Sequence, residues 1–348
     1  MRESGIFDES YEKDMAIVRT RRHWAALIGT IAFLLLIPLI VSNYYVNFLS
    51  NIFITVIAAL GLQIVTGYCG QISLGQPAFI AVGAFTSAIL TAHFHLSFWL
   101  ALPLSGVAAG LVGLIGGAPS LRIKGFYLAM ATVAIFYLIV WLITHLKITG
   151  GTGGLTVPPP QIGNMVFDTD KRMYYIVMIV TLIMTFYARN LVRTRVGRAF
   201  IAIRDNDIAA EVMGINLYYY KLLAFFISCF YAGVAGSLMA HWYLMVHSDQ
   251  YTIVQAVFYI GMIIIGGMGS IPGTYFGVIL VRLIDEVVLF CCPLLSSTFP
   301  WVGRAPAASL GVSAFGLVLI LFILYEPNGL AYRWEVIKAS YRIYPFKN

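Results

Sequence analysis

Long apolar stretches, separated by short polar or charged segments, follow one another through almost the whole chain. Between positions 23 and 121, 99 consecutive residues include no Asp, Glu, Lys or Arg. One helical crossing of a bilayer takes about 20 apolar residues, so this stretch alone has room for about four crossings. The pattern therefore predicts an all-α polytopic membrane protein.

Ten apolar runs are expected to form transmembrane helices. Their approximate bounds are residues 24–41, 48–67, 72–92, 97–117, 125–146, 173–188, 221–243, 253–268, 273–292 and 308–325. This arrangement gives an N-terminal segment (1–23), a transmembrane domain (24–325) and a C-terminal tail (326–348). The domain includes an outer loop (147–172), rich in Gly and Pro, and an inner loop (189–220).

Composition and charge support a membrane protein and set its orientation. The 348 residues are 60% hydrophobic and 11% charged, whereas soluble domains carry about 25% charged residues. With both termini in the cytoplasm, 17 of the 22 Lys and Arg residues lie on the cytoplasmic side. Transmembrane proteins show this bias, so the net charge of +7 does not point to nucleic acid.

The stretch "TGYCGQISLGQPAF" (66–79) is polar and rich in glycine, although apolar runs flank it. Irregular backbone inside a bilayer is tolerated only where it is buried in protein or lines an aqueous cavity, and transporters use such breaks to bind substrate. "GGMGSIPG" (266–273) is a similar stretch, and the two could face each other. Tight helix packing through small residues, as expected at Gly83 and Ser87, is the alternative. The residues expected to line a translocation path are Gly67, Gly70, Gln71, Ser73, Leu74, Gly75, Gln76, Phe79, Gly266, Gly267, Gly269 and Ser270.

The inner loop is expected to contain a short helix over residues 208–213. Asp205 or Asp207 could cap its N-terminus, and Gly214 could end it in a left-handed conformation. Its apolar side would consist of Ile208, Val212 and Ile215. Such a helix could lie on lipid head groups, but the acidic residues favour docking into a groove on another protein.

Few other residues suggest chemistry. Arg282, Asp285 and Glu286 lie on one face of the ninth run, where they form either an ion pair or a substrate contact. The six histidines lack accompanying Cys or carboxylate clusters, so no metal site is predicted. The four cysteines show no metal-binding spacing and are interpreted as small apolar residues.

Five motifs, in this order along the chain, resemble a known family. They are the stretch 66–79 above, "LRIKGFYLAMAT" (121–132), "TGGTGGL" (149–155), "GRAFIAIRDNDIAAEVMGINLYYYKLLAF" (197–225) and "IIIGGMGSIPGTYFG" (263–277). Together they resemble the LivM-type permease subunits of bacterial ATP-binding-cassette importers for branched-chain amino acids, in the BPD transporter 2 family. The likeness covers residues 48–285.

The resemblance implies an inner-membrane transport subunit that is not an enzyme and binds no cofactor. A second permease of LivH type would complete the path, and a periplasmic solute-binding protein would deliver the solute. ATPase subunits of LivG and LivF type would bind ATP and Mg²⁺, and this sequence has no phosphate-binding G-x-x-x-x-G-K-[ST] loop. The inner-loop helix would couple the chain to one ATPase. The coupling residues implied are Arg204, Asp205, Asp207, Ala209, Ala210, Glu211, Met213, Gly214 and Ile215.

Two alternatives remain at this point. Many relatives carry an acidic and then a basic residue in the fifth run, where this chain has Tyr137 and Val140. The solute could therefore be urea, a short amide or an aromatic acid instead. An ion-coupled secondary transporter would need carboxylates near the membrane midplane, but no Asp or Glu lies between Asp14 and Asp168.

Overall fold

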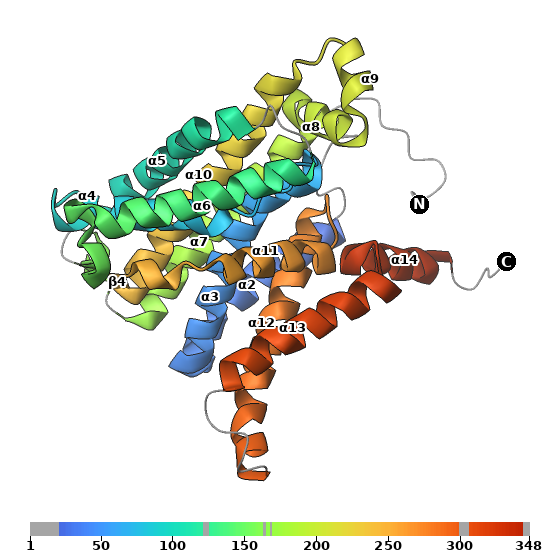
Figure 1. Ribbon diagram of the computed structural model, residues 1–348. Coiled ribbons are helices and arrows are strands. Elements are labelled where there is room, and N and C mark those ends of the chain that lie inside the picture. The colour runs from blue at the N-terminus through green and yellow to red at the C-terminus, as the bar shows by residue number, and fades with distance from the viewer. Residues whose placement is uncertain (1–20, 121–124, 163–164, 168, 299–305, 344–348) are drawn as a thin grey trace.

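The protein is a helical bundle in which short irregular connections join long apolar helices (Figure 1). The computed structural model describes residues 21–120, 125–162, 165–167, 169–298 and 306–343. Its α-helices are α2 (Arg21–Ile40), α3 (Asn43–Leu62), α4 (Gln76–Ala92), α5 (Phe98–Ser120), α6 (Phe126–His145), α7 (Asp170–Arg193), α8 (Arg195–Asp205), α9 (Asp207–Val212), α10 (Leu217–Tyr243), α11 (Ile253–Gly266), α12 (Ile271–Thr298), α13 (Pro306–Tyr325) and α14 (Gly329–Ile343).

Each of the ten apolar runs coincides with a helix, but not every helix is long and apolar enough to be a candidate span. In the described residues, six stretches qualify: Asn43–Tyr68, Phe98–Ala118, Tyr127–His145, Asp170–Arg193, Leu217–Tyr243 and Ser248–Gly266. A seventh is possible if Gly311–Tyr325 and Gly329–Ser340, bent by 46°, form one span. The apolar part of α2 (Ile28–Ile40) and α4 are shorter. The segment 326–348, expected to be a tail, contains α14.

The outer loop forms short pieces of structure, as its Gly and Pro content predicts. Two 3₁₀ turns, Lys147–Thr149 and Gly151–Gly153, precede β1 (Leu155–Thr156). Strand β1 pairs antiparallel with β4 (Met245–Val246), which lies just after α10. Strands β2 (Gln161–Ile162) and β3 (Met165–Val166) pair with each other.

Helix α10 lies at the centre of the bundle and packs most extensively against α5, α4 and α3. Small residues permit a very close approach of α4 to α10. A Cβ added at Gly83 would lie 2.3 Å from the Cα of Gly233, and the Ser237 hydroxyl donates a hydrogen bond of 2.8 Å to the Ser87 Oγ. The packing expected at Gly83 and Ser87 is confirmed.

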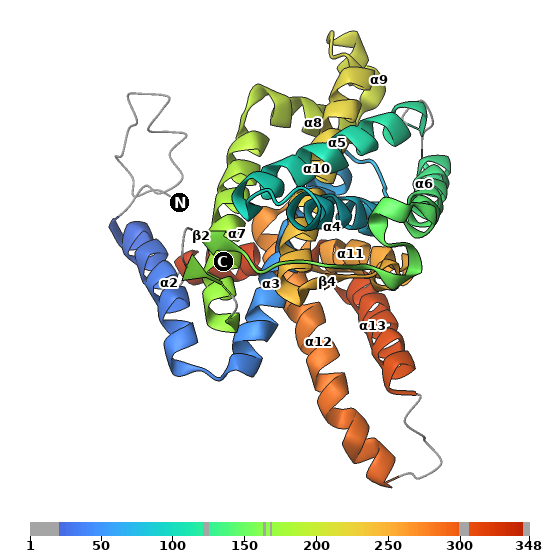
Figure 2. The same cartoon turned by 90° about the vertical axis from the view of Figure 1, so that its left-hand side faces the viewer.

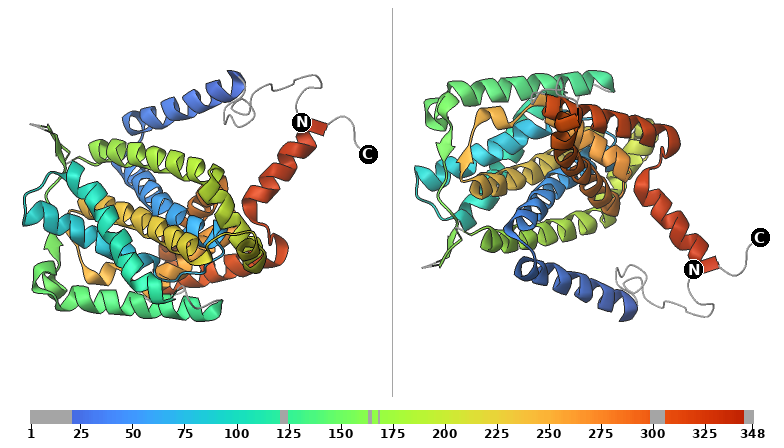
Figure 3. Two further views of the ribbon diagram at one scale, coloured as in Figure 1. Left: turned by 90° about the horizontal axis from the view of Figure 1, so that it is seen from above. Right: turned by 90° about the horizontal axis from the view of Figure 1, so that it is seen from below.

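The arrangement of the helices places the inner loop and the outer loop at different ends of the molecule. Helices α8 and α9 project at one end, and α14 lies toward the same end (Figure 1). The C-terminal part of α12 and the start of α13 extend away from the bundle (Figure 2). Helix α2 lies at the periphery beside α7 (Figure 3), where the Tyr174 hydroxyl donates to the Leu34 carbonyl at 3.0 Å.

Candidate functional site

The first glycine-rich stretch is a break between two helices. Helix α3 continues as one π-helical segment, Gln63–Tyr68, and such segments frequently occur at functional sites. Gly70 then turns the chain with φ 71°, and α4 begins only at Gln76. The span expected over 72–92 therefore starts as irregular backbone, because Gly75 and Pro77 favour a helix start at that point.

The second glycine-rich stretch, between α11 and α12, lies directly against the first. Gly267 and Gly269 both have positive φ, 112° and 78°. The Gln63 Nε2 donates to the carbonyls of Gly267 (3.0 Å) and Ser270 (3.1 Å). A Cβ at Gly67 would come within 2.7 Å of the Gly269 amide nitrogen. Two segments far apart in the sequence thus form one junction, which we call the glycine junction (Gln63–Gly70 and Gly266–Ser270).

Two of the expected path residues have structural partners instead of facing a cavity. The Gln76 Nε2 donates to the Ala58 carbonyl at 2.7 Å, and its Oε1 accepts from the Ser228 hydroxyl at 3.3 Å. Phe79 packs edge-to-face on Phe225, with ring centroids 5.6 Å apart. These contacts anchor the start of α4 to α3 and α10.

Residues 73–75 lie against α6. The Leu74 amide donates to the Thr132 Oγ1 at 2.9 Å, and the Gly75 amide donates to the Ser73 Oγ at 3.4 Å. A Cβ at Gly75 would come within 3.3 Å of the Thr132 carbonyl. The backbone amides of Leu74 and Gly75 are therefore satisfied within the protein.

Gln71 differs from its neighbours. Its side chain is 4% exposed, yet neither its Oε1 nor its Nε2 has a hydrogen-bond partner. It lines a cavity of about 360 Å³ together with Gly70, Arg204, Asp207 and Lys221. Since buried polar groups are nearly always hydrogen-bonded, this amide is an unusual unsatisfied group beside the cavity.

Cys69 lines the same cavity but contributes no reactive group. Burial raises the pKa of its thiol to about 12, so the thiol is neutral at physiological pH. Cys69 and Cys229 are both free and buried, as expected of small apolar residues. Cys291 and Cys292 lie where side chains are not described, and the described residues contain no group of His, Cys, Asp and Glu that could hold a metal ion.

Arg204 connects the inner loop to the glycine junction. Its Nη1 donates to the Gly67 carbonyl at 3.1 Å, while its Nε and Nη2 donate to the Asp205 Oδ1 at 3.0 and 2.9 Å. A Cβ at Gly269 would lie 2.7 Å from the Arg204 Nη1. The resemblance assigns Arg204 to the ATPase contact, but its side chain turns toward the membrane domain.

The inner loop contains two helices where one was expected. Helix α8 precedes the predicted short helix, which is α9. The prediction of an Asp cap was wrong, because the Asn206 Oδ1 accepts the Ala209 amide at 3.0 Å. Asp207 instead forms an ion pair with Lys221 at 4.0 Å. Gly214 has φ 85°, which confirms the left-handed end.

Helix α9 projects from the body of the protein (Figures 1 and 2). Ile208, Val212 and Met213 are 68%, 82% and 81% exposed. Ala210 faces inward and is 4% exposed, while Ile215 packs against the hydrophobic core and not with Ile208 and Val212 as expected. The exposed apolar tip is typical of a segment that binds another surface.

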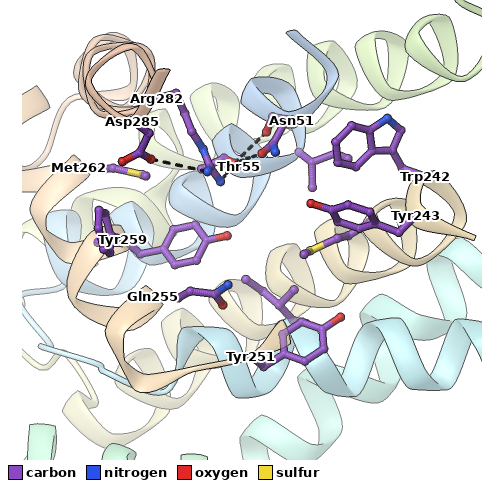
Figure 4. Close-up of a pocket in the computed structure, with 14 residues that line it drawn as sticks. Asn51, Thr55, Trp242, Tyr243, Tyr251, Gln255, Tyr259, Met262, Arg282 and Asp285 are labelled. Atoms are coloured by element: carbon purple, nitrogen blue, oxygen red, sulfur yellow. Dashed lines mark hydrogen bonds and ion pairs between the residues drawn. The ribbon is translucent and has the colours of Figure 1, made fainter. Parts of the chain in front are cut away.

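A second cavity, of about 230 Å³, lies between α3, α10, α11 and α12 (Figure 4). The Arg282 Nη1 and the Asp285 Oδ2 lie 3.9 Å apart across the predicted ion pair. The Arg282 Nη2 also donates to the Thr55 Oγ1 at 2.8 Å. Glu286 lies outside this pair and accepts a hydrogen bond from the Tyr44 hydroxyl.

Sequence reasoning missed the residues of α11 and its approach that complete this second cavity. Tyr251, Gln255 and Tyr259 line it. A spacing of four residues places Gln255 and Tyr259 on one helix face. That spacing was the only available signal, because Tyr residues also occur throughout the apolar helices.

Comparisons with known proteins agree with the motifs. The family described as branched-chain amino acid transport system, permease component, matches residues 44–324. The high-affinity branched-chain amino acid transport system permease proteins LivM of Salmonella typhimurium and Escherichia coli are each 30% identical over 318 residues, covering 84% of this chain and 71% of each relative. The corresponding LivH protein of Escherichia coli is 25% identical over 312 residues, covering 81% of this chain and 92% of the relative. No solved structure matches this chain significantly.

Proposed function

This chain belongs to the family of permease components of branched-chain amino acid transport systems, and we propose that it forms, with a second permease, the translocation path of an ATP-driven importer for these amino acids. Family membership makes it a multi-pass protein of the bacterial plasma membrane and not an enzyme. We further propose ten spans with both termini in the cytoplasm. The partners are a LivH-type permease, two ATPases of LivG and LivF type, and a periplasmic solute-binding protein.

The contact between Arg204 and Gly67 is the observation that carries the proposal. Arg204 belongs to α8 and lies three residues before the start of α9, and its guanidinium reaches the glycine junction. A displacement of α9 by a bound ATPase would therefore be transmitted through one side chain to the two broken helices. Since interfaces of packed segments are bistable rather than continuously deformable, such a displacement can switch the junction between two arrangements.

The exposed surface of α9 supports docking to a protein. Its apolar tip (Ile208, Val212 and Met213) stands beside the exposed Glu211 and Asp205. Anionic lipid would repel these carboxylates, whereas a protein groove can supply both an apolar floor and complementary charge. We therefore propose that the exposed face of α9 forms the contact with one ATPase, whereas Arg204, Ala210 and Ile215 of the expected coupling residues face the rest of this chain.

The glycine junction and Gln71 supply the polar groups expected along a path for an amino acid. A zwitterion that leaves water needs hydrogen-bond partners, and breaks in transmembrane helices commonly provide them. Gln71 offers both a donor and an acceptor that no protein group uses. We propose that the glycine junction and Gln71 form the part of the path next to the ATPase contact.

Reconstitution tests this function directly. The complete importer with its binding protein, placed in liposomes, should take up leucine, isoleucine and valine when ATP is supplied to the ATPase side, and ionophores should not stop the uptake. Uptake driven by an ion gradient without ATP would identify a secondary transporter instead. ATP-driven uptake of urea, short amides or aromatic acids in place of leucine would support the proposed class of transporter but contradict the proposed substrate.

Reversing the charge of Glu211 or fixing the backbone at Gly214 is expected to uncouple transport. Gly214→Pro cannot adopt the φ of 85° that the turn requires, because proline fixes φ near −65°. Each of Glu211→Arg and Gly214→Pro should lower leucine uptake at least tenfold, with the protein retained in the membrane. Lys338→Glu, a charge reversal at an exposed position of α14, serves as the control. Wild-type uptake by both variants at equal protein level would reject the docking role of α9.

Gln71→Leu is expected to separate stability from transport. The change removes two buried, unpartnered polar atoms, and an unsatisfied buried group costs about 1–3 kcal/mol. The thermal midpoint of the purified complex should therefore stay equal or rise, while leucine uptake falls at least threefold. Uptake equal to that of the wild type would show that the amide plays no part in the path.

A further inference from the structure

The cavity in Figure 4 lies inside this one subunit, apart from the glycine junction. Its volume is about 230 Å³. One water molecule occupies about 30 Å³ in the liquid, whereas pockets for drug-sized ligands have about 300–1,000 Å³. The cavity thus fits a small metabolite and is too large for one or two ordered waters.

Two opposite charges stand at one wall of this cavity. Arg282 and Asp285 both line it, and their closest charged atoms are 3.9 Å apart. That separation exceeds the 2.7–2.9 Å or so of a charge-assisted hydrogen bond. Each group therefore retains the capacity to bind a further charged partner.

Several polar atoms at the cavity lack protein partners. The Arg282 Nε is buried and has no hydrogen-bond partner. The Tyr251 side chain is 4% exposed, and its hydroxyl also has no partner. Figure 4 shows the hydroxyls of Tyr243 and Tyr259 and the amide of Gln255 turned toward the middle of the cavity. The Gln255 Nε2 also donates to the Gln250 carbonyl at 2.7 Å, which fixes the orientation of this amide. Buried polar groups in native proteins are nearly always satisfied, so these unsatisfied atoms add to the polar character of the residues around the cavity.

Apolar side chains form the remainder of the lining. Ile54, Ile80 and Met262 are buried, and with Phe258 and Met239 they line the cavity from α3, α4, α10 and α11. The cavity therefore combines one positive group, one negative group and an aliphatic wall.

We propose that this cavity binds a zwitterionic amino acid with an aliphatic side chain during its passage through the membrane. Arg282 receives the α-carboxylate, Asp285 receives the ammonium group, and the wall around Ile54, Ile80 and Met262 receives the side chain. The proposal rests on the proposed transport function and adds a substrate site within this subunit. It favours an amino acid over urea, because a zwitterion can form an ion pair with each charge whereas neutral urea can form only hydrogen bonds.

Exchanging the two charges distinguishes a substrate site from an ion pair that only stabilises the fold. Arg282→Gln and Asp285→Asn should each lower ATP-driven leucine uptake at least tenfold in the complete reconstituted importer. The double variant Arg282→Asp/Asp285→Arg retains an ion pair but reverses the positions of the charges, so uptake should remain at least tenfold below wild type. Recovery to within twofold of wild type in the double variant would overturn the proposal, as would single variants within twofold.

One control variant and two milder variants complete the test. Glu286→Gln changes the neighbouring carboxylate, which accepts from Tyr44 away from this cavity, and should stay within twofold of wild type. If the charge variants fail to assemble, Tyr251→Phe and Gln255→Leu retain most of the side-chain volume. They should raise the KM for leucine at least threefold, and unchanged kinetics would overturn the proposal. A wild-type importer that moves no leucine with ATP would instead reject the proposed function.

Discussion

Replacing Gly67 with alanine is expected to lower ATP-driven uptake at least tenfold. The added Cβ would lie 2.7 Å from the amide nitrogen of Gly269, closer than packed atoms approach, so the two halves of the glycine junction must separate. Separation would also lengthen the bonds from Gln63 to the carbonyls of Gly267 and Ser270. Overpacking of this kind costs about 1–3 kcal/mol, and each 1.4 kcal/mol or so changes an equilibrium tenfold.

The measurement compares leucine uptake with ATP hydrolysis in the same reconstituted complex. Gly67→Ala should retain hydrolysis and lose uptake, because the substitution alters the junction and not α9. Gly316→Ala is the matched control, since nothing lies within 4 Å of a Cβ at that position of α13. Uptake by Gly67→Ala within twofold of the control would show that the junction does not move during transport.

Hydropathy predicted which residues form helices because a long apolar run inside a bilayer can satisfy its backbone hydrogen bonds only as a helix. Backbone groups in lipid must be satisfied within the segment, so each run coincides with a helix regardless of its neighbours. Whether α4 and α12 each cross the bilayer was less predictable, because the places of these helices depend on how they pack against the rest of the bundle. Helix α4 is short and buried against α10 through Gly83 and Gly233, a contact between segments far apart in sequence.

Part of the candidate site could be predicted because polar residues within an apolar stretch are costly to bury and therefore indicate a functional or structural role. The stretches containing Gln71 and Gly269 were recognisable in this way, and the structure places both near Arg204. Their relation to Arg204 was not predictable, since hydrophobic periodicity says nothing about which loop reaches which break. The predicted N-terminal cap of α9 was wrong for a local reason. Asp205, Asn206 and Asp207 can all cap a helix, and the ion pairs of both Asp residues leave Asn206 for that position.

The second cavity could not be predicted from the sequence, because residues far apart in the chain form it. Its lining comes from α3, α4, α10, α11 and α12, and only Arg282 and Asp285 stand out as charges within an apolar run. The tyrosines around them resemble those that commonly lie at membrane interfaces. Only the folded bundle shows that Tyr251 and Gln255 meet the ion pair in one place.

Arg204→Ala is expected to abolish coupling between the inner loop and the glycine junction. The variant loses the hydrogen bond to the Gly67 carbonyl and the pairing with Asp205. Hydrogen bonds to charged groups contribute about 1.5–3 kcal/mol, so uptake should fall between about tenfold and a hundredfold. ATP hydrolysis should continue, because α9 and its Asn206 cap remain in place.

Two further variants separate a mechanical link from a general effect of charge. Arg204→Lys retains the positive charge but cannot donate to Gly67 and Asp205 together, since lysine lacks the planar fork of arginine; it should recover only part of the uptake. Arg198→Ala removes an exposed arginine from the same helix and should leave uptake within twofold. If Arg198→Ala and Arg204→Ala impaired uptake equally, the inner loop would act through its net charge, and the contact with Gly67 would not transmit movement. If only Arg204→Ala stops uptake while hydrolysis persists, movement of α9 reaches the membrane path through this one guanidinium.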